Sequence, residues 1–143
     1  MKSGKFWIAV LAAGVVMNII DFLVQGMWLM NTVYSQYPET FNMEGNPVWF
    51  IIGEFITVFV LAWVYDKVYG SFGGGVGGGA LYGFYAGVLV NFPTWIFIHL
   101  FMKGFSYGVA WIWTVNGIVW AVIAGAIIGA IYKKGSASAV KSI

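Results

Sequence analysis

The chain has 143 residues, a length typical of one domain. Hydrophobic residues make up 61% of it and charged residues only 8%, whereas about 25% of an ordinary soluble domain is charged. So few charges exclude a soluble enzyme, a disordered tail and a nucleic-acid binder with a basic face. Because the sequence has no cysteine and one histidine, it also excludes disulfides, thiolate metal sites and multi-histidine sites within one chain.

Four apolar segments are each long enough to cross a bilayer as a helix, which takes about 20 residues. They cover residues 6–30, 47–69, 80–102 and 107–132. These runs are too long and too continuous for the strands of a membrane barrel. We therefore expect an all-α integral membrane protein, with residues 1–143 forming a single antiparallel four-helix transmembrane bundle. The remaining segments are an outer loop over 31–46, a glycine-rich cytoplasmic loop over 70–79 and a polar tail over 133–143.

The lysines are divided unevenly between the two sides of this bundle. Only Lys103 falls on the side of the outer loop. The other six fall on the side of the two termini: Lys2, Lys5, Lys67, Lys133, Lys134 and Lys141. By the positive-inside rule, this predicts a multi-pass protein of the cytoplasmic (inner) membrane with both termini in the cytoplasm. The net charge of +2 is too small to imply an anionic partner beyond lipid headgroups, and we expect no nucleic-acid partner.

Small residues recur every four positions in the third and fourth segments, the pattern called a glycine zipper. The two sets are Gly75, Gly79, Gly83 and Gly87, and Gly117, Ala121, Gly125 and Gly129. A face of small residues lets two helix backbones approach closely. Because the connection between the two segments is short, we expect these faces to pack against each other within one chain. A homo-oligomer interface is the alternative.

Polar side chains fall within every predicted span, mostly in its outer half. They are Asn18, Asp21, Gln25, Glu54, Asn91, Thr94 and Asn116. Amides and hydroxyls in such positions usually form hydrogen bonds between helices. A carboxyl group is more costly in a bilayer, so Asp21 is expected to be protonated or paired with a donor such as Asn116 or Gln25. Asp21 and Glu54 lie at similar depth, and if they meet, one should hold a proton, and the pair could carry protons or bind a cation.

His99 lies near the outer end of the third predicted span. The simpler interpretation is an interfacial residue with its hydrogen bonds satisfied. The alternatives are a single axial ligand to haem or chlorophyll, or one ligand of a metal site shared with Asp21, Glu54 and Gln25. No local spacing motif supports a metal site, and the sequence requires no cofactor. In the same span Pro93 should kink the helix beside Asn91.

Three short motifs resemble small bacterial four-span proteins that are known only as domains of unknown function. They are Asn18-Ile-Ile-Asp21-Phe, Leu89-Val-Asn91-Phe-Pro93 and Trp113-Thr-Val-Asn116-Gly117. The resemblance covers most of the chain. It implies a prokaryotic cytoplasmic membrane protein and no particular activity.

Three functions remain open at this point. The first is a non-catalytic accessory or interaction subunit of a membrane complex, favoured by the minimal loops and by the lack of a nucleophile–base set. The second is a small transporter or a homo-oligomeric proton or cation pathway that uses Asp21 and Glu54. The third is a haem, pigment or quinone binder that uses His99. An enzyme is not expected, and the partners expected are the bilayer and either further copies of the chain or a larger complex.

Overall fold

The computed structural model describes residues 4–42 and 44–132. Lys2 and the predicted polar tail, with Lys133, Lys134 and Lys141, lie outside the described residues. Within the described part the chain is all-helical and has no strand. Four of its helical stretches are long and apolar enough to cross a membrane, which confirms that part of the sequence-based prediction.

The first span, Gly4–Gln36, is built from four consecutive helical pieces. They are α1 (Gly4–Asp21), the π-helix η1 (Phe22–Leu29), α2 (Met30–Thr32) and the short 3₁₀ helix η2 (Tyr34–Gln36). The helical path therefore continues through Gln36, into the segment that the sequence predicts as outer loop. Side-chain hydrogen bonds back to carbonyls one turn earlier accompany this extension, from Asn31, Thr32 and Gln36.

The second span is α3 (Pro47–Val68), extended by the 3₁₀ helix η3 (Tyr69–Phe72). It begins at Pro47 because Asn46 caps it, its Oδ1 accepting a hydrogen bond from the Val48 backbone N–H at 3.0 Å. The third span, α4 (Gly75–Phe101), begins inside the segment that the sequence predicts as a glycine-rich loop. The turn is confined to the glycines just before the helix, and Gly73 and Gly74 take the positive φ angles that glycine allows.

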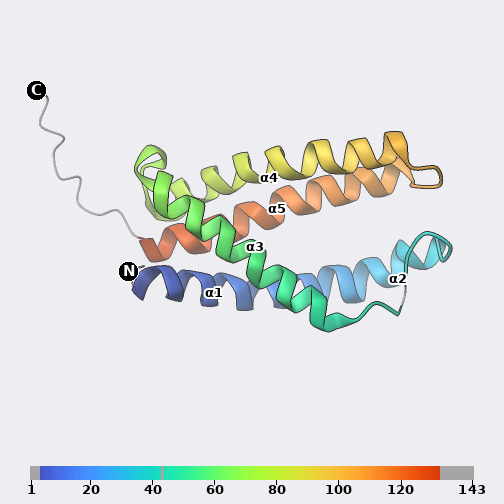
Figure 1. Ribbon diagram of the computed structural model, residues 1–143, viewed down its shortest axis with the longest axis horizontal. Helices are drawn as coiled ribbons and strands as arrows, with labels where there is room; N and C mark the ends of the chain where they lie inside the picture. Colours follow the sequence, from blue (N-terminus) through green and yellow to red (C-terminus); the bar gives the residue numbers. More distant parts are fainter. Residues whose placement is uncertain (1–3, 43, 133–143) are drawn as a thin grey trace, which may run out of the picture.

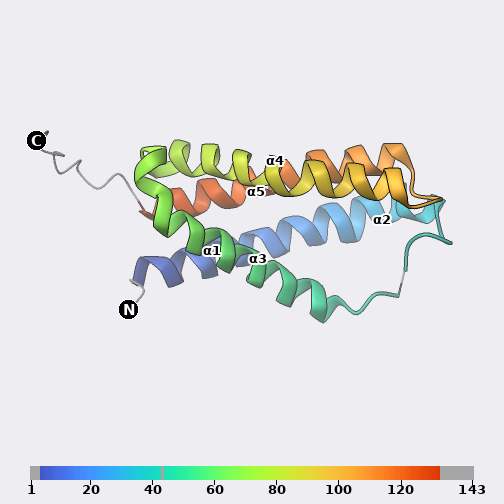
Figure 2. The same cartoon turned by 45° about the horizontal axis from the view of Figure 1, so that its top comes forward.

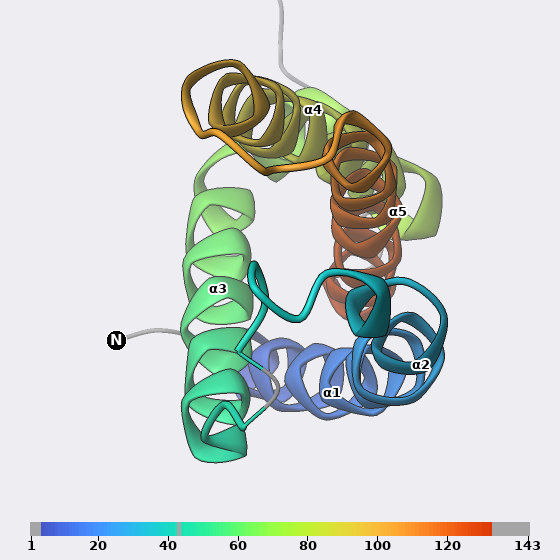
Figure 3. The same cartoon turned by 90° about the vertical axis from the view of Figure 1, so that its right-hand side faces the viewer.

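Successive long helices run in alternate directions, so Gly4 and Tyr132 lie at the same end of the molecule (Figure 1). The fourth span, α5 (Tyr107–Tyr132), lies beside α4 along its whole length. α1 packs against both α3 and α5. The first half of α3 diverges from α4 and α5 (Figures 2 and 3), and α3 has few contacts with α4.

The faces of small residues on α4 and α5 pack against each other within the chain. A Cβ added to Gly79 or Gly83 would collide with the backbone of α5, and one added to Gly129 would lie 2.8 Å from the Gly79 Cα. Two members of the stripes behave differently. Gly75, the first residue of α4, has nothing within 4 Å of an added Cβ; its φ of 69° is what favours glycine there. Gly117 instead makes room for the side chain of Asn91.

The buried core gathers at the end of the molecule where the described chain begins and ends. Its largest members come from the start of α1, the second half of α3, the start of α4 and the end of α5: Phe6, Tyr65, Tyr82, Ile128 and Tyr132. Tyr132 Oη donates to Asp66 Oδ1 at 2.9 Å, and Tyr82 Oη donates to the Leu61 carbonyl at 3.0 Å. One end of the bundle is therefore packed. At the other end the first half of α3 diverges from α4 and α5, so the helices are less closely packed there.

Candidate functional site

A cavity of about 1110 Å³ lies between the helices beyond this packed core. Its lining draws on α1, η1, α3, α4 and α5, and on residues between η2 and α3. Sites for small organic ligands in proteins commonly measure about 300–1000 Å³ and are mostly apolar with a few converging polar groups. The cavity has the size and the mixed lining of such a site.

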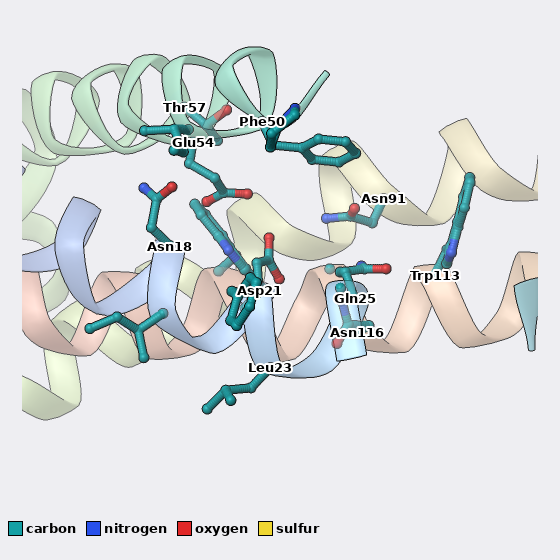
Figure 4. A pocket seen from close by; sticks show the side chains of 18 of the residues that line it. Asn18, Asp21, Leu23, Gln25, Phe50, Glu54, Thr57, Asn91, Trp113 and Asn116 are labelled. Carbon is teal, nitrogen blue, oxygen red and sulfur yellow. The ribbon is translucent and has the colours of Figure 1, made fainter. Parts of the chain in front are cut away.

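The structure brings together six of the seven polar residues that the sequence singles out. Asn18, Asp21, Gln25, Glu54, Asn91 and Asn116 all line the cavity (Figure 4). Thr94 does not: its side chain is exposed, and its hydroxyl donates to the Val90 carbonyl of its own helix. Thr94 lies three residues beyond Asn91, and a small difference in angle about the helix axis turns it away from the cavity.

The carboxyl groups of Asp21 and Glu54 point toward each other from α1 and α3 (Figure 4). The carboxyl group of Glu54 interacts with two polar neighbours, the carboxyl group of Asp21 and the indole of Trp120. Even so, Glu54 Oε2 and Trp120 Nε1 are buried without a hydrogen bond of standard geometry among the described residues. No Lys, Arg or His lines the cavity, so this part of the chain supplies no cation to balance the two carboxyl groups.

The π-helix η1 places Gln25 in the cavity wall. Asp21 is the last residue of α1, and Gln25 lies in the middle of η1. A π-helix has more residues per turn than an α-helix, and π-helical segments are frequent at functional sites. The helix therefore changes its winding between Asp21 and Gln25, whose spacing of four residues would place them on one face of a regular α-helix.

Two tryptophans and a tyrosine form a hydrogen-bonded wall at the end of the cavity away from the packed core. Trp113 Nε1 donates to Tyr34 Oη at 2.6 Å, and the Tyr34 hydroxyl in turn donates to Gln25 Oε1. Trp95 Nε1 donates to Asn91 Oδ1 at 3.2 Å, and its ring packs edge-on against Trp113. These bonds hold the amides of Gln25 and Asn91 in place.

Phe41 covers this wall from the segment that follows η2. Its ring centroid lies 4.5 Å from that of Tyr34 and 5.5 Å from that of Trp113. Sequence reasoning missed these roles, because aromatic residues at the ends of spans are normally explained by the membrane interface. No local pattern indicates that residues 79 positions apart form a hydrogen bond.

His99 lies away from the cavity. Its Nδ1 is 2.9 Å from the Phe105 carbonyl oxygen, and its ring packs on Tyr107, so it ties the end of α4 to the turn before α5. Among the described residues no group of three or more His, Cys, Asp or Glu side chains could hold a metal ion. The structure does not bring His99 together with Asp21, Glu54 and Gln25, because the turn before α5 holds His99 away from the cavity.

No protein-family model, curated protein or solved structure matches this chain. The resemblance to small bacterial four-span proteins therefore stays a prediction.

Proposed function

We propose that this protein is a small membrane transporter that binds its solute in the central cavity and exchanges a proton at the Asp21–Glu54 pair. One observation carries the proposal: two carboxyl groups face each other in a cavity of about 1110 Å³, and none of the described residues that line it is cationic. Two carboxylates at short range repel each other, so protons or a bound cation must balance them. A site whose charge depends on its occupant is suited to coupling a solute to protons.

A single chain contains this cavity, so the proposal differs from a pore built between copies. Four long helices and the segment before α3 all contribute to its lining. The stripes of small residues on α4 and α5 pack against each other, so those two faces are not left for a homo-oligomer. The accessory-subunit hypothesis does not explain why six costly polar groups converge on one hollow region.

The protein would lie in the cytoplasmic membrane with both termini in the cytoplasm. The division of the lysines supports this orientation. Under it, the packed core lies in the inner half of the membrane and the aromatic wall of Tyr34 and Trp113 in the outer half. The cavity would then be separated from the cytoplasm by the tyrosine-rich core and from the outside by the aromatic wall.

The proposal is tested by proton movement in reconstituted vesicles. Wild-type protein in liposomes that contain a pH-sensitive dye is challenged with solutes of four classes: potassium, an organic cation, an organic anion and a neutral sugar. We expect at least one class to drive a proton flux, and the flux to disappear in the double variant Asp21→Asn/Glu54→Gln.

The matched control removes two carboxyl groups outside the cavity. Glu39 and Glu44 lie exposed in the segment between η2 and α3, so Glu39→Gln/Glu44→Gln should behave like the wild type. If no class of solute moves protons through the wild-type protein, the transporter proposal is wrong. If the Asp21→Asn/Glu54→Gln variant gives the same proton flux as the wild type, the proposal is also wrong, because the carboxyl pair would then not take part in proton exchange.

A further inference from the structure

The polar atoms of the cavity divide into those already bonded and those left for an occupant. Asn91 uses its Oδ1 for Trp95 and its Nδ2 for the Gly87 carbonyl at 3.0 Å. Asn18 uses its Nδ2 for the Gly14 carbonyl at 2.8 Å, which leaves its oxygen. Beside the carboxyl groups of Asp21 and Glu54, the Asn18 oxygen is therefore a further acceptor, and a donor or a positive charge would satisfy it.

The charge of this region is unbalanced. Asp21, Glu54 and Asn18 supply oxygen atoms, and no basic side chain of residues 4–42 and 44–132 lines the cavity. The buried Trp120 Nε1 is a donor at the same place, but it is neutral. An uncompensated carboxylate in a bilayer is costly, so the electrostatics favour an occupant that brings positive charge.

The rest of the lining is suited to an organic cation and not to a bare metal ion. Ca²⁺ and Mg²⁺ need about six or more oxygen ligands in a tight shell, and no cluster of three acidic or metal-binding side chains exists among the described residues. The cavity instead offers eight aromatic rings, which attract large cations through their faces. They belong to Phe22, Tyr34, Phe41, Phe50, Phe55, Trp95, Trp113 and Trp120.

Several apolar side chains that line the cavity also keep a large exposed surface. Phe50 is 68% exposed and Ile51 50%, and both lie on the diverging first half of α3. Such apolar surface is compatible with contact with lipid tails in a bilayer. A ligand with an apolar body can therefore approach from the bilayer, past α3, without crossing a polar surface.

We propose that the cavity binds an amphipathic organic monocation, with its positive group between Asp21 and Glu54 and its apolar body against the aromatic lining. This inference rests on the proposed function, because it names the class of solute for the same site. The amide of Gln25 adds a specific feature. Its Oε1 accepts from Tyr34, so its Nε2 is the group left to donate to an oxygen atom of the ligand.

The test compares two ions of the same shape and opposite charge. Tetraphenylphosphonium and tetraphenylborate are titrated separately into the detergent-solubilised wild-type protein, and quenching of tryptophan fluorescence reports binding beside Trp95, Trp113 and Trp120. We expect the cation to bind saturably and at least ten-fold more weakly to Asp21→Asn/Glu54→Gln. The Glu39→Gln/Glu44→Gln control should bind it like the wild type, and tetraphenylborate should show no dependence on the carboxyl pair.

A second measurement needs no variant and covers the case in which Asp21→Asn/Glu54→Gln does not fold. A lipophilic carbodiimide labels protonated carboxyl groups in apolar surroundings, and mass spectrometry locates the label. Tetraphenylphosphonium should protect Asp21 and Glu54 from labelling, while tetraphenylborate should not. Equal labelling with and without the cation would overturn the inference.

The two proposals can fail separately. If tetraphenylphosphonium does not bind, but an anion or a sugar drives a carboxyl-dependent proton flux, the transporter proposal stands and the organic-cation inference is wrong. If the cation binds to the pair and no solute moves protons, the protein is a cation-binding membrane protein and not a proton-linked transporter. If a co-purified lipid occupies the cavity and tetraphenylphosphonium does not displace it, the inference is also wrong.

Discussion

The substitution Gly79→Ala adds one methyl group at the closest approach of α4 and α5. Its Cβ would collide with the carbonyl of Gly125 and lie 2.8 Å from the Gly129 Cα. Both are backbone atoms, which cannot rotate away as a side chain can, so the two helices must separate. Overpacking costs about 1–3 kcal/mol, and alanine recovers about 0.5–1 kcal/mol over glycine in a helix. We therefore expect a net loss of up to about 2.5 kcal/mol in the free energy of unfolding.

The matched control is Gly77→Ala, two residues earlier on the same helix. Nothing lies within 4 Å of a Cβ added at Gly77, so only the gain in helix propensity remains, up to about 1 kcal/mol. Equilibrium unfolding in mixed micelles with increasing dodecyl sulfate, followed by circular dichroism, measures both variants. If Gly79→Ala is as stable as Gly77→Ala, the two backbones do not approach as closely as described, and the argument from the small-residue faces is refuted.

Two further predictions concern the outer wall of the cavity and the orientation in the membrane. Tyr34→Phe removes the hydroxyl that accepts from Trp113 and donates to Gln25, so it should cost about 1–3 kcal/mol of stability and shift the tryptophan emission. The control Tyr37→Phe should leave the emission unchanged. If Tyr34→Phe causes no shift in emission, the described hydrogen bonds are contradicted. The lysine distribution places residues 103 and 67 on opposite sides of the membrane. Lys103→Cys should therefore react with a membrane-impermeant maleimide in intact cells, and Lys67→Cys only after the cells are opened. The reverse pattern would show that the termini lie outside the cell.

Much of the site could be anticipated from the depth of polar residues along each span. Asn18, Asp21, Gln25, Glu54, Asn91 and Asn116 were expected at related depths, and the structure places all six around one cavity. Depth follows from counting residues at about 1.5 Å each, which requires no knowledge of the neighbouring helices. Thr94 shows the limit of this reasoning, since its depth is suitable but it lies on the wrong side of α4.

Other features of the site could not be anticipated. The bond between Tyr34 and Trp113 joins distant parts of the chain, and the π-helix η1 has no pattern of its own in the sequence. The start of α4 at Gly75 was missed because consecutive glycines favour a loop when considered alone. In the folded protein, Gly79 and Gly83 are part of the helix, and α5 packs against them so closely that only glycine fits.

Composition and the lengths of the apolar segments are sufficient to predict four helices that can cross a membrane, because a bilayer excludes charge and demands spans of a particular length. The short connection between α4 and α5, together with the spacing of their small residues, likewise predicts that these two helices pack against each other. The cavity, in contrast, depends on how the helices pack against one another. It exists because α4 and α5 pack tightly while the first half of α3 diverges, and because α1, α3, α4 and α5 each turn a polar face to the same space. The separation and rotation of helices depend on how side chains on different segments fit together, and no single segment of the sequence encodes that fit.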